Sequence, residues 1–163
     1  MSTLTSQKKQ SGWDSDEAIQ MADRKKRAAA ALWPVLSAFQ GIEDQRLQAV
    51  WHVFQEGSLH EVVLKFESVS LAAMAASDDS IGLDLTRHQS GNSDGVDVSE
   101  LDPWRAFIGK PFGWGWITMN QQGYCDGILL SFEEVAFPEL VLNVVAASIK
   151  IGRIRSIVSR AKE

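Results

Sequence analysis

The spacing of hydrophobic residues along this chain of 163 residues changes near residue 46. Before that point, Leu32, Val35, Leu36 and Phe39 recur every three or four residues, which is typical of the buried face of an α-helix. Pro34 falls within this stretch and prevents the simple continuation of a helix. We therefore expect either a helix that stops near Leu32, followed by a second short helix from Pro34, or one helix with a bend.

The start of the helical segment is marked by Asp14 and Glu17, whose spacing of three residues fits a capping box. The residues before Asp14 are rich in Ser, Thr, Gln and Lys, and they offer too little apolar surface to offset the entropy cost of ordering them. The pattern predicts a disordered tail over residues 1–13 and a helical segment over residues 14–41.

From residue 46 onward, hydrophobic residues recur at every second position, as they do on one face of a β-strand. In the first such run Leu47, Ala49 and Trp51 share one face, and further runs separated by turn sequences follow. Counting these runs predicts about seven or eight strands. The chain is too short for two domains of comfortable size. We expect one α+β domain over residues 14–163, with the helical segment packed on a mainly antiparallel sheet within residues 46–158.

The most aromatic part of the chain, residues 104–132, contains a predicted hairpin. On its first arm Trp114 and Trp116 share a face, and on its second arm Ile128 and Leu129 lie on opposite faces. Both faces of the hairpin are therefore apolar, which a sheet with one solvated side does not tolerate. Either the N-terminal helix or a second copy of the protein is expected to cover the second face. The tryptophans are interpreted mainly as core residues, with a recognition surface as the alternative.

The charge and cysteine content narrow the environment and the partners. The formal net charge of −5 argues against nucleic acid, because phosphate binding needs a cationic surface. Cys125 is the only cysteine, so no internal disulfide can form and a reducing compartment is expected. The sequence has no secretory signal pattern and no apolar run of about 18 residues, so we expect no membrane association and a cytoplasmic location.

The residue types that could carry chemistry do not form a recognisable catalytic or metal-binding motif. His52 and His60 flank one predicted turn but lack a third ligand at a useful spacing. The polar stretch over residues 92–100 does not have the glycine and glutamate positions of an EF-hand loop. Cys125 lies within a predicted strand without a cation or histidine to activate it, so it is interpreted as a small hydrophobic residue. We therefore predict no catalytic residue, no metal and no cofactor.

One part of the chain also resembles a known family. The run PWRAFIGKPFGWGWITMNQQGYCDGILLSF and the later LVLNVVAASIKIGRI resemble the C-terminal signature of a family of small uncharacterised bacterial proteins, classed as a domain of unknown function. The resemblance covers about residues 47–154 and implies no activity, so it transfers no catalytic residue.

The absence of a catalytic motif favours a non-enzymatic protein-binding module. Small, acidic, cysteine-poor domains of this kind resemble the immunity proteins that neutralise bacterial toxins by occluding them, and acidic residues would steer association with a basic toxin. A small-ligand-binding protein or enzyme with an aromatic pocket around Trp114 and Trp116 is one alternative, and a homodimeric structural module is another. The predicted partner-binding residues are Asp78, Asp79, Asp94, Asp97, Trp114 and Trp116.

Overall fold

The computed structural model describes residue 19 and residues 32–87, 95–133 and 137–154. The predicted tail over residues 1–13 lies outside this part of the chain, as does most of the helical segment before residue 32. No helix within these described ranges has the length and apolarity needed to cross a membrane.

The helical segment appears as a helix over residues 32–41. Pro34 lies inside this helix, so the chain does not break between residues 32 and 41. Val35 and Phe39 are buried, as their spacing predicts, whereas Leu36 is 41% exposed. The helix ends at Gly41, and glycine is required at this position because a Cβ atom would overlap the side chain of Leu85.

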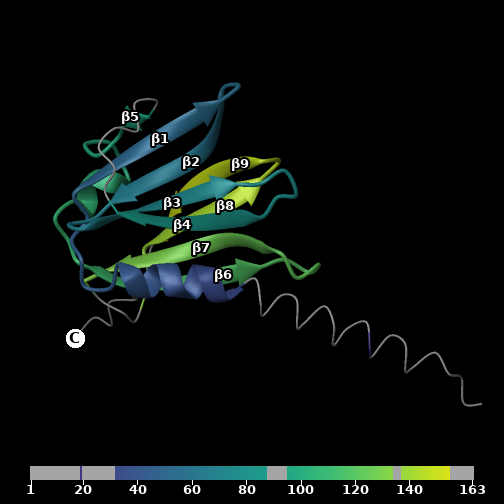
Figure 1. Ribbon diagram of the computed structural model, residues 1–163. Helices are drawn as coiled ribbons and strands as arrows, with labels where there is room; N and C mark the ends of the chain where they lie inside the picture. The colour runs from purple at the N-terminus through teal and green to yellow at the C-terminus, as the bar shows by residue number, and fades with distance from the viewer. Residues whose placement is uncertain (1–18, 20–31, 88–94, 134–136, 155–163) are drawn as a thin grey trace, which may run out of the picture.

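The described residues after the helix form nine strands, which are arranged in two antiparallel sheets (Figure 1). The first sheet has the order β4-β3-β2-β1-β5, and the second has the order β6-β7-β8-β9. The first sheet comprises β1 (Ala49–Gln55), β2 (Ser58–Lys65), β3 (Val69–Ala75), β4 (Ile81–Arg87) and β5 (Val96–Asp97). The second comprises β6 (Phe112–Met119), β7 (Cys125–Phe132), β8 (Leu140–Val145) and β9 (Ser148–Arg153), and the 3-10 helix η1 (Trp104–Ala106) connects the two sheets.

The architecture confirms an α+β arrangement with antiparallel pairing, but it corrects the prediction of one sheet with about seven or eight strands. The strands are divided five and four between two sheets. The apolar face of one sheet must be covered by another layer, and here the two sheets cover each other. Alternation identifies an apolar strand face but does not say which other strands share its sheet.

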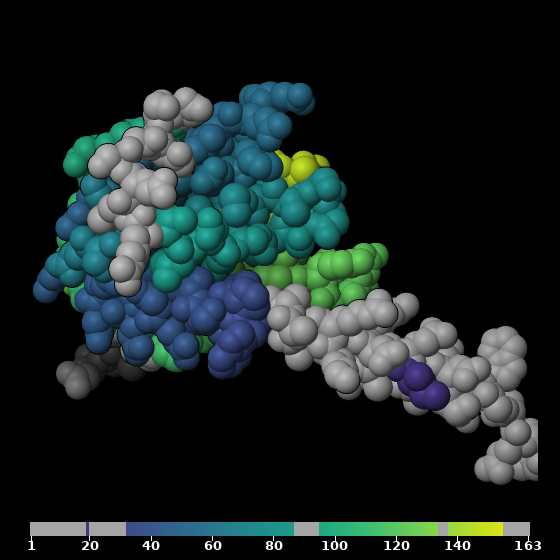
Figure 2. Space-filling view, viewed as in Figure 1, coloured from purple at the N-terminus to yellow at the C-terminus, as the bar shows by residue number. Residues whose placement is uncertain are grey.

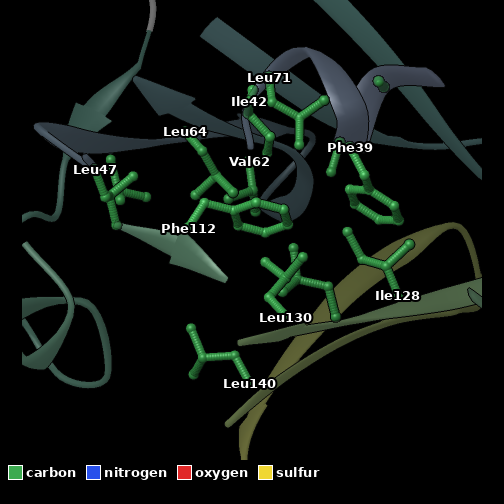
Figure 3. Close-up of a cluster of buried hydrophobic side chains, with 14 of the residues drawn as sticks. Phe39, Ile42, Leu47, Val62, Leu64, Leu71, Phe112, Ile128, Leu130 and Leu140 are labelled. Atoms are coloured by element: carbon green, nitrogen blue, oxygen red, sulfur yellow. The ribbon is translucent and has the colours of Figure 1, made fainter. Parts of the chain in front are cut away.

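The core lies between the sheets, with β9 against β2 and β7 against β4. In Figure 3 the ring of Phe112 lies between Val62 of the first sheet and Leu130 of the second. The Phe112 ring also stacks on Phe39 of the helix, with 5.9 Å between ring centroids. One continuous cluster of buried side chains therefore joins the helix and both sheets.

The helix closes the side of the molecule where β4 and β6 are the last strands of their sheets (Figure 1). Its C-terminal end contacts Leu85 of β4 through Gly41, and Phe39 contacts β6 at Gly115. The second sheet is apolar on both faces, as predicted: Ile128 is fully buried, while Trp116 and Leu129 are paired neighbours on the opposite face and are half-buried. The helix packs on the inner face, at Gly115, so it is not the cover expected for that second face.

Candidate partner-binding groove

A hollow of about 230 Å³ lies between the helix and the start of β6. Its walls are mainly apolar, and the helix that forms one of them lies on the surface below the first sheet (Figure 2). We call this hollow the groove. It is lined by Trp33, Leu36, Phe39, Gln40, Glu43, Phe112, Gly113, Trp114 and Gly115.

The helical repeat places the residues of one wall of the groove on the same side of the helix. Trp33, Leu36, Gln40 and Glu43 are separated by three or four residues, so they lie on one side of the helix and its C-terminal turn. Trp33 is 68% exposed. Phe39 lies at the base of this side with its ring directed at β6, and it is almost completely buried.

The strand side of the groove depends on an irregularity in β6. The pairing register with β7 shifts between Phe112 and Trp114. Phe112 enters the core, whereas Trp114 is 44% exposed. Gly115 has no side chain, and a Cβ atom there would stand 2.6 Å from the Phe39 ring. The glycine therefore allows the helix to approach β6 and to form the groove beside Trp114.

One end of the groove is acidic. Glu43 lines the hollow, and Asp44 follows it with its backbone N–H donated to the carbonyl of Phe112 at 3.3 Å. Both side chains are exposed, and within the described chain neither carboxylate forms an ion pair. The nearby Lys110 is already paired with Glu133 at 2.9 Å. The negative charges at this end are therefore open to a partner.

The predicted acidic residues hold turns together and do not gather at the groove. Asp78 accepts hydrogen bonds from the hydroxyl and backbone N–H of Ser80, at 2.6 and 3.1 Å, and these bonds lower the pKa of the Asp78 carboxyl. The neighbouring Asp79 accepts the backbone N–H of Ala147 at 2.7 Å, which links the β3–β4 turn to the β8–β9 turn.

Asp97 has a similar structural role in β5. Its carboxylate accepts hydrogen bonds from the hydroxyl and the backbone N–H of Ser99, at 2.6 and 2.9 Å. These hydrogen bonds lower the pKa of the Asp97 carboxyl. The Ser99 oxygen in turn accepts the backbone N–H of Val50 at 2.9 Å. Figure 1 places β5 at the opposite end of the first sheet from the β3–β4 turn. Asp94 lies outside the described residues.

Of the two tryptophans predicted to bind a partner, one lies at the groove and the other does not. Trp114 lines the groove, whereas Trp116 lies on the outer face of the second sheet and does not line it. Sequence reasoning missed Trp33 and Glu43, and it placed Leu36 on the buried face of the helix. The available signal was a second helical stripe, in which Trp33, Leu36 and Gln40 share a side adjacent to the buried residues.

His52 and Cys125 have structural surroundings. The Trp104 side chain is fully buried, and its indole N–H donates to Nε2 of His52 at 2.9 Å. Burial lowers the pKa of His52, which matches the neutral imidazole that this hydrogen bond requires. Burial raises the pKa of the Cys125 thiol, the opposite of what activates a nucleophile. Among the residues that the structure describes, no three His, Cys, Asp or Glu side chains are grouped to hold a metal ion.

The fold defines a domain of two antiparallel sheets closed on one side by a helix. The chain belongs to a family of unknown function, DUF6334, whose model matches residues 35–158. This confirms the resemblance to an uncharacterised domain and extends it into the helix, so that the match includes every groove residue except Trp33. No curated protein and no solved structure matches the chain.

Proposed function

We propose that this protein is a non-enzymatic protein-binding module and that the groove is its contact surface. The observation that carries the proposal is the exposure of three large apolar side chains, Trp33, Leu36 and Trp114, around one hollow. Exposed apolar side chains that gather in one place mark interaction sites, and tryptophans contribute strongly to binding at such sites.

The size of the groove favours a protein partner over a small ligand. Small-molecule sites usually enclose about 300–1,000 Å³ and combine apolar walls with several converging polar groups. The groove is smaller, about 230 Å³, and Gln40 and Glu43 are the only polar side chains among the described residues that line it. It suits one apolar side chain projecting from a partner. Trp116 does not line it, so the alternative of a pocket built around both tryptophans has less support.

Charge supports a basic partner. The chain has a formal net charge of −5, and Glu43 and Asp44 expose carboxylates at one end of the groove that pair with no cation among the described residues. Opposite charges across an interface accelerate encounter and select partners. This supports the form of the proposal in which the protein acts as an immunity protein, binding a basic toxin and covering its active surface.

The test is co-expression of the protein with the product of the neighbouring gene, followed by purification and measurement of the mass of the complex. We expect a one-to-one complex and loss of the neighbour's toxicity. In the variant Trp33→Ser/Trp114→Ser, affinity should fall at least about 30-fold, because a single central anchor often contributes 2 kcal/mol or more. Both side chains are substantially exposed, so the variant should remain folded.

Phe54→Ser is the matched control, because Phe54 is also an exposed aromatic residue, at 52%, but it lies in β1 of the other sheet. The control should bind as the unmodified protein does. A complex that tolerates the double substitution in the groove would rule out the groove as the contact surface. A neighbouring product that neither binds nor harms cells would rule out the immunity role.

A further inference from the structure

The floor of the groove is a strand edge. β6 is the last strand of its sheet, with β7 as its neighbour. In an antiparallel pair, the backbone N–H and C=O groups of alternate residues point to the partner strand, and those of the residues between point away. In β7 the Leu130 carbonyl accepts the backbone N–H of Glu139, the residue just before β8, at 2.8 Å, and the Phe132 N–H points to the same side, where it donates to the Glu139 carboxylate at 2.9 Å. Even-numbered residues of β7 therefore face β8, and odd-numbered residues face β6.

This alternation identifies the backbone groups at the outer edge of β6. Leu129, an odd-numbered residue of β7, is paired with Trp116. The backbone groups of Trp116 therefore point to β7, and those of Gly115 and Ile117 point to the open side. In the described chain, no hydrogen bond beyond the β6–β7 ladder involves Gly115 or Ile117.

The start of the same edge is already paired. The Phe112 N–H donates to the carbonyl of Gln45 at 2.8 Å, and its carbonyl accepts the N–H of Asp44 at 3.3 Å. The described chain thus places a short strand-like segment beside the first residue of β6, and none of its other residues pairs with the rest of that edge. An added strand would continue along β6 from the point where this segment ends.

The open part of the edge, between the two register shifts of β6, carries no charged residue and no proline that would discourage strand addition. Natural edge strands carry charged residues or proline that discourage pairing with another chain. β6 reads FGWGWITM and contains neither. Gly113 and Gly115 both line the groove, and the Phe39 ring occupies the space of the missing side chain at Gly115. An edge of this kind beside a helix can bind an extended segment through backbone hydrogen bonds, with side-chain pockets that provide selectivity.

We infer that the partner contributes an extended segment, which adds to β6 as a fifth strand of the second sheet. This inference rests on the proposed function. The segment bonds through its backbone to Gly115 and Ile117 and places one apolar side chain in the groove against Phe39. A lysine or arginine near that side chain meets Glu43 and Asp44, whose carboxylates form no ion pair within the described chain.

The test uses linear 12-residue peptides from a displayed random library, selected on the intact protein. Selected peptides should carry apolar residues at alternate positions with a neighbouring Lys or Arg. The Trp33→Ser/Trp114→Ser variant should not retain them, whereas Phe54→Ser should. A synthetic copy of one selected peptide is then N-methylated at each position in turn. Because alternate N–H groups face the protein, methylation should weaken binding about 10-fold or more at every second position and little between.

The outcomes separate this inference from the proposed function. Peptides that depend on Trp33 and Trp114 but show no alternation with N-methylation would overturn strand addition and leave the groove as a binding surface. Failure to select any peptide that depends on the groove would overturn the inference of strand addition. The proposed function would then be judged independently, by the co-expression test with the product of the neighbouring gene. A two-fold increase in mass of the protein alone, abolished by Trp33→Ser/Trp114→Ser, would assign the edge to a second copy and overturn the inference of a different partner.

Discussion

Replacement of Gly115 by alanine tests the contact that positions the helix against β6. The added Cβ atom would stand 2.6 Å from three atoms of the Phe39 ring. Carbon atoms in relaxed contact lie about 3.5–4.0 Å apart, so the ring would have to withdraw by about 1 Å. It has little room to do so, because Phe39 is 6% exposed and its ring is stacked on Phe112 at 5.9 Å.

The expected cost follows from overpacking. Extra atoms in a well-packed core typically lower the free energy of unfolding by about 1–3 kcal/mol. Alanine recovers about 0.5–1 kcal/mol relative to glycine by restricting the unfolded chain. We therefore expect Gly115→Ala to lower the free energy of unfolding by about 1–2 kcal/mol. For a protein of this size, the midpoint of thermal unfolding should fall by roughly 2–8 °C.

The assay is urea unfolding at neutral pH, followed by circular dichroism, for Gly115→Ala alone and in a Phe39→Leu background. The smaller leucine should accept the new methyl group, so the two substitutions should show a coupling energy of about 1 kcal/mol. Gly82→Ala is the control, because a Cβ atom at Gly82 meets no atom within 4 Å. Without a clash, Gly82→Ala should not lower the free energy of unfolding, and the restriction of the unfolded chain alone should raise it by about 0.5–1 kcal/mol.

An equal cost for Gly115→Ala with and without Phe39→Leu would refute the reasoning, since the penalty would then not arise from the Phe39 ring. A cost no larger than that of Gly82→Ala would refute it as well. Either result would mean that the helix does not depend on this glycine for its position beside the groove.

Three further measurements test individual contacts. Because burial lowers the pKa of His52, its neutral form stabilises the fold fully above pH 6.5, and this contribution should be lost as the pH falls from 6.5 through the lowered value. Urea titrations between pH 7.5 and 5 should show this loss, and His52→Gln should remove that part of the pH dependence. Ala147 has a positive φ of 55°, so Ala147→Gly should raise the free energy of unfolding by about 0.5–1 kcal/mol, whereas Ala76→Gly should lower it. Because burial raises its pKa, Cys125 should react with a thiol reagent at pH 7 much more slowly in the folded protein than in urea, and equal rates would contradict its burial.

Local periodicity predicted a large part of the fold because each element must place its apolar residues on one side. The spacing of Val35 and Phe39 located a buried helix face, and both residues are buried. The alternation along residues 114–132 located a hairpin with two apolar faces, and the structure has that arrangement. Periodicity did not show how far the buried face of the helix extends around its surface. Leu36 lies at the margin of the helix stripe and is exposed because the core contacts of the helix are made by Val35, Ala38 and Phe39.

The candidate site was harder to predict because its two sides are far apart in the sequence. Trp114 and Trp116 have the same place in the alternating pattern and pair in regular register with Ser131 and Leu129, but of the two only Trp114 lines the groove beside the helix. Asp78 and Asp97 were predicted as partner contacts from their charge, whereas their carboxylates accept hydrogen bonds from nearby serines. Whether a carboxylate is engaged in such a bond depends on the turn geometry, which composition does not contain.

The sequence by itself determined the elements of this protein: a helix with one buried stripe, a series of antiparallel strands, and an aromatic hairpin with apolar residues on both faces. These features depend on the direction of side chains within a few consecutive residues, and that direction follows from helical or strand geometry. Only the tertiary structure decided that the strands divide into two sheets, that Phe39 meets Gly115, and that Trp33 lies across a groove from Trp114. These contacts join residues about 80 positions apart, and they depend on how the layers pack rather than on any local pattern.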